Sequence, residues 1–271
     1  MPKFAANLSM LFTEQPFLDR FAAAARAGFS GVEYLFPYEY SAEEVAHALQ
    51  AAGLEQVLFN LPAGDWAVGE RGIAALPARV DEFRAGVSKA IAYAQALGCP
   101  RLNALAGKLP ADVAFEDAWE TLVANLRFAA ETCERAGIAL VAEAINTYDI
   151  PGFMLSCSER AFALIREVGS TNLTLQYDIY HMQRMEGELA ATLRAHIAEI
   201  GHVQLADNPG RHEPGTGEIN YPFLFTVLDE IGYSGWIGCE YVPAHGTEAG
   251  LGWAKEFLHP ATAAALSEHG Q

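Results

Sequence analysis

The sequence predicts a single α/β domain folded as a TIM (β/α)8 barrel. The chain has 271 residues, which suits one large domain, and 51% of them are hydrophobic, enough to fill a sizeable core. Eight short apolar runs alternate with eight helical segments, a pattern typical of this barrel. Most of the runs are nearly continuous, as in parallel strands buried on both faces. No internal repeat or linker appears, so we expect residues 1–271 to form one domain.

The first four strand–helix units are bounded by clear helix signals. Ser41 followed by Glu44 matches a capping box and predicts the start of the second helix, which Gly53 ends. A glycine also follows each of the other three helices. The predicted strands are residues 4–10, 31–37, 54–61 and 101–107, and the other predicted helices are residues 17–27, 79–97 and 114–136.

The last four units repeat the pattern. Their predicted strands are residues 138–146, 173–180, 202–206 and 236–242, and their predicted helices are residues 158–168, 187–199, 221–231 and 247–258. One earlier connection, from residue 62 to about residue 77, contains several glycines. It exceeds the roughly 12–15 residues of an ordinary connection, and such a loop is typically a lid or a binding loop.

The charge and the cysteines of the chain indicate where it works. Seventeen basic and 34 acidic residues give a net charge of -17, which disfavours binding to nucleic acid or to an anionic membrane. The amino-terminal segment lacks the pattern of a signal peptide, and no apolar run reaches the roughly 18 residues that cross a bilayer. The four cysteines form no C-x-x-C pair and are predicted to be free thiols. We therefore expect a cytoplasmic protein.

Four predicted strands each carry one polar side chain close to their carboxyl ends. These residues are Glu143, Asp178, Gln204 and Glu240. Side chains alternate along a strand, so an inward orientation would bring the four together at the mouth where barrel enzymes build their sites. A charge inside an apolar strand is costly unless it is coordinated or, as the alternative, paired with a neighbouring Arg or Lys. Three carboxylates and one amide oxygen suit Mg²⁺ or Mn²⁺ better than Zn²⁺.

Several stretches are distinctive in combination. They are FAANLSMLF, GVEYLFPY, FNLPAGDWAVGERGIA, the strand around Glu143 with DIPGF, QYDIYHMQRMEGEL, VQLADNPGRHEPGTGEINY and WIGCEY. With these stretches the chain resembles the hydroxypyruvate isomerases, a family of sugar isomerases and epimerases within the xylose-isomerase-like TIM barrels. The resemblance runs over nearly the whole chain and implies one such barrel domain.

The resemblance also implies roles for particular residues. Glu143, Asp178, Gln204 and Glu240 fall where the wider group holds its divalent metal ion. Glu143 and Glu240 also fall where the group places its two proton-transfer carboxylates. His181, three residues after Asp178, matches a histidine that contacts the substrate.

The implied reaction interconverts hydroxypyruvate and tartronate semialdehyde. A proton moves between adjacent carbons through an enediol, and a metal ion that holds the carbonyl and hydroxyl oxygens would stabilise this intermediate. One carboxylate removes the proton and the other returns it. The substrate is a small anionic hydroxy-oxo acid, whose own carboxylate requires a cation.

The cation for the substrate carboxylate has three candidates. Lys108 follows the strand at residues 101–107 and is the first choice, with Arg71 and Arg211 next. For each of them, a solvated surface charge is the alternative. Glu70 lies beside Arg71 in the long loop and is expected either to help close the site or to hold the loop together.

The same sequence features are compatible with other activities. A 2-oxo-tetronate isomerase would use the same mechanism, and so would a ketose 3-epimerase. Many epimerase relatives carry histidine where this chain has Gln204, and arginine where it has Gly210. A metal-dependent hydrolase, such as an endonuclease barrel, needs more histidines and a basic face. A non-catalytic binding barrel is the last alternative. Barrels of the group that the chain resembles often associate, so the resemblance implies a homo-oligomer.

Overall fold

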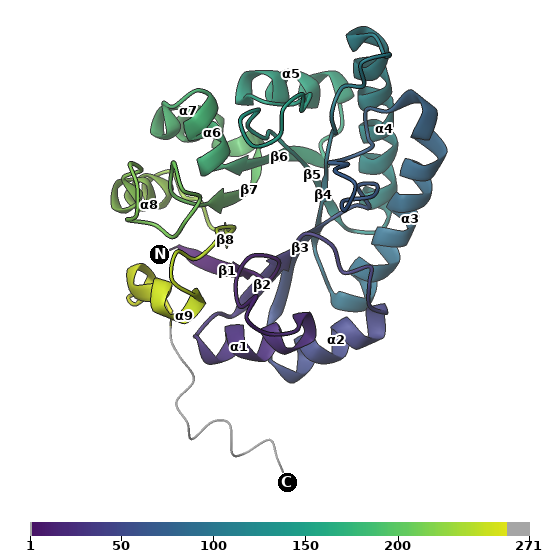
Figure 1. Cartoon of the computed structure of the whole chain (residues 1–271). Coiled ribbons are helices and arrows are strands. Elements are labelled where there is room, and N and C mark those ends of the chain that lie inside the picture. The colour runs from purple at the N-terminus through teal and green to yellow at the C-terminus, as the bar shows by residue number, and fades with distance from the viewer. Residues whose placement is uncertain (1, 259–271) are drawn as a thin grey trace.

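A closed barrel of eight parallel strands forms the centre of the protein (Figure 1). The structure is a computed structural model that describes residues 2–258. The strands follow the order of the sequence around the barrel, and the last pairs with the first. They are β1 Lys3–Asn7, β2 Gly31–Tyr34, β3 Glu55–Asn60, β4 Arg101–Ala104, β5 Ala139–Glu143, β6 Leu173–Asp178, β7 Ile200–Leu205 and β8 Trp236–Cys239. The predicted TIM barrel is confirmed.

Helices surround the strands on the outside of the barrel (Figure 1). They are α1 Arg20–Arg26, α2 Ala42–Ala51, α3 Val80–Leu97, α4 Phe115–Arg135, α5 Ser158–Val168, α6 Ile179–Met185, α7 Leu189–His196, α8 Tyr221–Glu230 and α9 Thr247–Gly250. Short 3-10 turns lie at Phe17–Asp19, Pro77–Arg79, Ile197–Glu199 and Leu251–Ala254. The capping box predicted for α2 is present, because Ser41 and Glu44 exchange both of its hydrogen bonds. Within residues 2–258, no helix is both long and apolar enough to cross a membrane.

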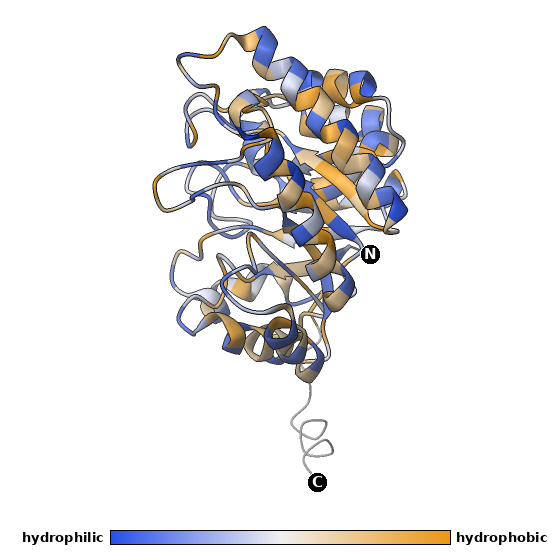
Figure 2. Ribbon diagram, turned by 90° about the vertical axis from the view of Figure 1, so that its right-hand side faces the viewer, coloured by the Kyte–Doolittle hydropathy of each residue, from blue (hydrophilic) through white to orange (hydrophobic). Residues whose placement is uncertain are grey.

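The hydrophobic core has two parts. The larger part fills the space between the strands and the surrounding helices, where the ribbon is mainly orange (Figure 2). The smaller part lies inside the barrel and consists of Ala5, Val57, Leu58 and Val141, with Trp236 packed against it. Fully burying a side chain of the size of Val57 or Leu58 stabilises the fold by about 1.5–3 kcal/mol. The apolar residues fill one end of the barrel interior and leave the other end to polar side chains.

Several predicted elements extend past their ends in the structure, and two of them have a clear physical reason. The strand predicted at residues 173–180 stops at Asp178, because the side chain of Asp178 accepts hydrogen bonds from the backbone N–H groups of Tyr180 and His181 and so starts α6. The helix predicted at residues 247–258 ends as α9 at Gly250 and continues only as a 3-10 turn. Gly250 and Gly252 weaken a helix here, since glycine loses more backbone freedom than other residues.

The loop from residue 62 to residue 76 is held against the end of β4. Gly72 pairs with Ala106, and a Cβ atom at Gly107 would lie 2.3 Å from the backbone oxygen of Gly72. Gly107 also has a φ of 96°, which favours glycine. Long loops of this kind gather at the end of the barrel that faces away from the amino terminus (Figure 2).

Candidate active site

Four buried carboxylates lie at the carboxyl ends of the barrel strands. They belong to Glu33, Glu143, Asp178 and Glu240, and each residue is at most 5% exposed. The strand register supports this arrangement, since Asp178 is paired with Gln204, and Gln204 with Gly238, two residues before Glu240. The predicted convergence of Glu143, Asp178, Gln204 and Glu240 on the barrel mouth is therefore seen in the structure.

Glu143, Asp178 and His181 form a compact buried group. Nε2 of His181 lies 3.8 Å from Oε1 of Glu143 and 3.6 Å from Oδ2 of Asp178. These two carboxylate oxygens are buried and accept no hydrogen bond, whereas Asn103 donates to the other oxygen of Glu143 at 3.0 Å. Two unsatisfied anionic oxygens that face the same space fit a cation, and the three side chains together could hold a metal ion.

The hydrogen bonds around His181 determine which of its ring nitrogens carries the proton. Asn146 accepts from the backbone N–H of Asp149 at 2.8 Å and donates to the carboxylate of Asp149 at 3.0 Å, which fixes the amide orientation. The Asn146 nitrogen also lies 2.7 Å from Nδ1 of His181. Nδ1 must then accept, so the neutral ring carries its proton on Nε2. Burial and the nearby arginines lower the pKa of His181 well below its ordinary value, which keeps the ring neutral.

Arg211 is the cation of this site. Its Nη2 donates to Oε1 of Glu240 at 2.7 Å, and its guanidinium lies 5.2 Å from the ring centre of Tyr180. The Nε atom of Arg211 is buried and has no partner. Burial lowers the pKa of Arg211, but the negative charges of Glu240, Asp178 and Glu143 together raise it by more. The pKa therefore lies above its ordinary value. Arg211 is thus a charged donor with an unused N–H in the site.

Glu143, Asp178 and Glu240 have raised pKa values because they are buried beside one another. Burial is the largest cause of the raised pKa in each of these residues. The pKa of Glu143 lies well above its ordinary value, because the charges of Glu240 and Asp178 raise it in addition. The pKa of Asp178 is raised to about 6 and that of Glu240 to about 8, although Arg211 lowers both. A divalent cation would stabilise the ionised forms of these groups.

Glu33 was not singled out in the sequence, although it carries the same signal as Glu143 and Glu240. It is a charged residue in an apolar strand, Gly31–Tyr34, and it is fully buried. Its Oε2 lies 2.7 Å from Nε2 of His202, and its Oε1 accepts from Gln204 at 2.7 Å. Gln204 also donates to Glu240 at 2.6 Å. Glu33 thus shares hydrogen-bonding partners with a predicted proton-transfer residue.

The remaining predicted site residues lie around the long loop. Nζ of Lys108 donates to the backbone oxygen of Gly69 at 2.8 Å. Arg71 stacks on Trp66 at 4.2 Å and donates to backbone oxygens of the loop. Glu70 pairs with Arg79, which supports the interpretation that Glu70 holds the loop together. None of these contacts joins Lys108, Arg71 or Glu70 to the buried carboxylates.

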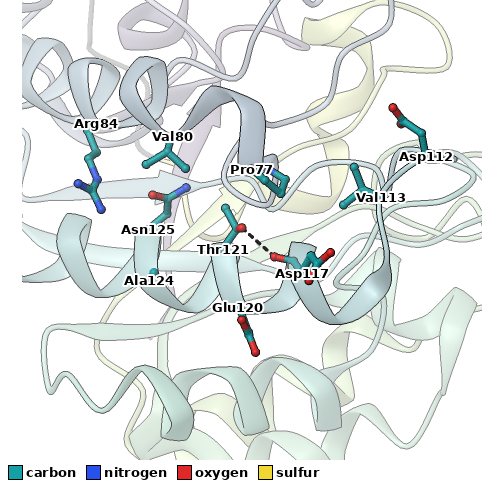
Figure 3. A pocket seen from close by; sticks show the side chains of 10 residues that line it. All are labelled: Pro77, Val80, Arg84, Asp112, Val113, Asp117, Glu120, Thr121, Ala124 and Asn125. Carbon is teal, nitrogen blue, oxygen red and sulfur yellow. Dashed lines mark hydrogen bonds between the residues drawn. The ribbon is translucent and has the colours of Figure 1, made fainter.

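A separate cavity lies on the outside of the barrel between α3 and α4 (Figure 3). Its volume is about 560 Å³, and its lining includes Arg84, Asp117 and Glu120. Asn125 at its edge donates to the backbone of Ala74. The cavity shares no residue with the group of buried carboxylates.

Comparison with known proteins identifies similar chains. A family profile described as "Xylose isomerase-like TIM barrel" matches residues 21–257. Over 253 residues the chain is 56% identical to a hydroxypyruvate isomerase of Escherichia coli (strain K12), covering 93% of this chain and 98% of that protein. It is 52% identical to a 2-oxo-tetronate isomerase of Cupriavidus necator, covering 95% and 99%. A solved structure described as an AP endonuclease, family 2, from Brucella melitensis is 46% identical with a TM-score of 0.93, covering 96% and 100%.

Proposed function

The chain belongs to the xylose isomerase-like TIM barrel family, and we propose that it is an isomerase that interconverts hydroxypyruvate and tartronate semialdehyde. The observation that carries the proposal is the pair of buried glutamates, Glu143 and Glu240, beside one cation and two unsatisfied carboxylate oxygens. The 56% identity to the hydroxypyruvate isomerase of Escherichia coli supports the same substrate.

A divalent ion is part of the proposed site. We propose Mg²⁺ or Mn²⁺, held by the free oxygens of Glu143 and Asp178, because carboxylates are the ligands that these ions prefer. When bound, the ion would polarise the substrate carbonyl and stabilise negative charge on the enediolate. The metal-ligand roles expected for Gln204 and Glu240 stay predictions, since both side chains are engaged in hydrogen bonds here.

The cation of the site suits the substrate carboxylate. The unpartnered Nε–H of Arg211 would donate to it, and a charge-assisted hydrogen bond of this kind contributes about 1.5–3 kcal/mol. His181 would donate from Nε2 to the oxygen on the reacting carbons. With both ends of the substrate fixed, the two carbons between which the proton moves lie close to the glutamates.

The proton transfer then needs one acceptor and one donor. Glu143 takes a proton from the hydroxyl-bearing carbon, which breaks the C–H bond and forms an enediol. The carbonyl carbon gains a proton from Glu240, the second buried glutamate of the site. The hydroxyl proton moves to the former carbonyl oxygen, so the substrate has the same number of protons before and after the reaction. Glu143 then loses its proton to solvent and Glu240 regains one from solvent before the next turnover. The reverse reaction uses the same groups in exchanged roles.

A four-carbon substrate is the second candidate. The 52% identity to the 2-oxo-tetronate isomerase of Cupriavidus necator favours it, and the same site chemistry would serve. A nuclease is a weaker candidate despite the similarity to the Brucella melitensis protein, because a net charge of -17 repels a polyanion. We further propose a cytoplasmic location and self-association into a homo-oligomer, without nucleic acid or membrane partners.

The experiment is proton NMR of the metal-loaded protein with hydroxypyruvate in D₂O. We expect tartronate semialdehyde to form with deuterium at the carbon that gains the proton, and Glu143→Gln and Glu240→Gln to abolish turnover. Turnover of a 2-oxo-tetronate alone would keep the mechanism and change the substrate. No turnover of either substrate would overturn the proposed activity.

A further inference from the structure

The loop between β7 and α8 is built around the carboxylate of Asp207. This residue is 1% exposed, and its side chain accepts hydrogen bonds from four backbone N–H groups of the loop. Oδ1 accepts from Asn208 at 2.9 Å and from Ile219 at 3.1 Å. Oδ2 accepts from Gly215 and Gly217, both at 2.9 Å. Each carboxylate oxygen thus accepts twice, which an asparagine side chain, with one oxygen, cannot reproduce.

The backbone of Asp207 joins the same loop to Arg211. The N–H of Asp207 donates to the carbonyl oxygen of His212 at 2.8 Å, and its carbonyl oxygen accepts from the N–H of Arg211 at 2.9 Å. The carbonyl oxygen of Arg211 in turn accepts from the N–H of Val242 at 2.9 Å, two residues beyond Glu240. Both backbone polar groups of Arg211 are therefore engaged, one by Asp207 and the other by the segment that follows β8.

Arg211 has a backbone conformation that arginine does not prefer. Its φ is 55°, in the left-handed region, where any residue with a Cβ atom is strained. Such a conformation persists only where the surrounding structure imposes it. From this backbone the guanidinium reaches Oε1 of Glu240 at 2.7 Å and lies over the ring of Tyr180. The direction of the Arg211 side chain therefore depends on the loop that holds its backbone.

We propose that Asp207 is a positioning residue, which holds the loop at residues 207–219 in the form that brings Arg211 to the substrate carboxylate. The inference rests on the proposed isomerase, in which Arg211 binds that carboxylate. Asp207 binds backbone groups of the loop, so it acts through Arg211 and not on the reacting carbons. A loop that is ordered in advance spares the substrate the cost of ordering it. Loss of the carboxylate is therefore expected to raise KM and to leave kcat largely unchanged.

Asp207→Asn is the variant that tests this role, because the two side chains have nearly the same size. Asparagine keeps one oxygen for two of the four N–H groups and turns an NH₂ group toward the other two. The second pair then has no acceptor, so the loop should open and Arg211 should leave the left-handed region. Asp65→Asn is the matched control. Oδ1 of Asp65 accepts from the N–H groups of Ala67 and Val68 at 3.0 and 3.4 Å, and asparagine keeps this oxygen.

The first test measures the loop without turnover. Trypsin cuts after arginine where the chain is free to extend into the protease, and the backbone hydrogen bonds of Arg211 oppose this. Limited digestion of the metal-loaded protein, followed by mass spectrometry, gives the rate of cleavage after Arg211, with cleavage after Arg71 as the internal reference. We expect Asp207→Asn to raise cleavage after Arg211 at least about tenfold and to keep cleavage after Arg71 within about twofold, since cleavage follows local opening. Asp65→Asn should be cut after Arg211 as slowly as the wild type. An equally slow rate in Asp207→Asn would overturn the inference.

The second test shows whether Asp207 acts through Arg211. It compares KM for hydroxypyruvate in Asp207→Asn, in Arg211→Gln and in the double variant. We expect Asp207→Asn to raise KM at least about threefold with kcat within about threefold, and the double variant to stay within about twofold of Arg211→Gln, because an arginine that is absent cannot be misplaced. Effects that multiply in the double variant would show two independent roles and would contradict the inference.

Gly217→Ala replaces Asp207→Asn in both tests if the latter fails to fold. A Cβ atom at Gly217 would collide with the backbone oxygen of Asn208 and lie 2.8 Å from Oδ1 of Asp207. The alanine should therefore push this segment away from Asp207 while the carboxylate is kept. Cleavage after Arg211 at the wild-type rate in Gly217→Ala would again overturn the inference.

The two tests separate the inference from the proposed function. Wild-type protein that turns over neither hydroxypyruvate nor a 2-oxo-tetronate would overturn the isomerase, whereas the cleavage after Arg211 would still show whether Asp207 holds the loop. Active wild type with an unchanged KM in a folded Asp207→Asn would overturn only the positioning role.

Discussion

Nδ1 of His181 accepts its hydrogen bond from the side-chain nitrogen of Asn146 at 2.7 Å. Because Asp149 fixes the Asn146 amide, His181 presents an N–H group from Nε2 to Glu143 and Asp178. His181 therefore turns an N–H group, and not a free lone pair, toward the two carboxylates, which leaves the carboxylate oxygens to hold an ion.

Asn146→Asp should reverse this tautomer. The new carboxylate would accept from Nδ1–H, so Nε2 would lose its proton and become a metal ligand instead of a donor to the substrate. We expect kcat to fall at least about tenfold, in line with the usual contribution of a positioned proton donor, while the affinity for Mn²⁺ rises. Asn220→Asp is the matched control, since Asn220 caps α8 and aspartate caps a helix equally well. Unchanged kcat in Asn146→Asp would argue against a donor role of His181.

Arg211→Gln should identify the cation that binds the substrate carboxylate. Among the three predicted cations, only Arg211 contacts the buried carboxylates, through Glu240. We expect its loss to raise KM for hydroxypyruvate at least about tenfold, which corresponds to about 1.4 kcal/mol. Arg71→Gln and Lys108→Gln serve as comparisons, because both side chains contact backbone oxygens of the loop. A larger KM effect in either of them would transfer the role to the loop.

Metal removal should destabilise the protein through Asp178. A saturating ion at about 100 times its dissociation constant adds about 2.7 kcal/mol to the free energy of unfolding. Asp178→Asn keeps one oxygen to accept the hydrogen bonds that start α6, so the variant should fold. It replaces the unpartnered oxygen with an NH₂ group that cannot bind a cation, so the stabilisation by the metal ion should be lost. The check is thermal unfolding of both proteins with Mg²⁺ and with a chelator. An equal rise of Tm in both proteins would place the ion elsewhere.

The stability of the metal-free protein should fall with rising pH through Glu240. Burial raises the pKa of Glu240 from 4.5 to about 8, so the folded state binds this proton more tightly than the unfolded state. The resulting stabilisation is complete below pH 4.5 and is lost as the pH rises through about 8. Relative to Glu240→Gln, the free energy of unfolding should therefore drop by at least about 1 kcal/mol between pH 5 and pH 8, roughly what one unit of pKa shift provides. Urea unfolding of both proteins at each pH measures it, and parallel curves would contradict the shift.

The sequence predicted those parts of the site that depend on strands. A charged residue within an apolar strand is recognisable without a structure, and alternation along the strand places it in the barrel; Glu143 and Glu240 were found in this way. Glu33 carries the same signal, because it is a charged residue within the apolar strand Gly31–Tyr34, but it was not predicted. The partners of Arg211 were not predictable, since they depend on the fold of the loop at residues 206–220.

The beginning of α6 shows a second limit. The residues after Asp178 continue an apolar pattern that fits a strand, and only the folded chain shows the Asp178 side chain accepting the N–H groups of the next turn. The same carboxylate offers its other oxygen to the proposed ion. A single residue that ends a strand, starts a helix and faces the site cannot be assigned all three roles from its position in the sequence.

Gly107→Ala should displace the long loop from the end of β4. An alanine there would place a Cβ atom 2.3 Å from the backbone oxygen of Gly72, and φ is already 96°, a conformation costly for alanine. Gly53→Ala is the matched control, because its φ is 65° and no atom lies within 4 Å of the added Cβ. We expect backbone strain alone to lower the free energy of unfolding of the control by about 1–2 kcal/mol. Gly107→Ala should lower the free energy of unfolding by more. A loop that closes over the site contacts the substrate, so Gly107→Ala should also raise KM and the control should not. Equal stabilities and equal KM values in the two variants would show that the contact with Gly72 does not hold the loop in place.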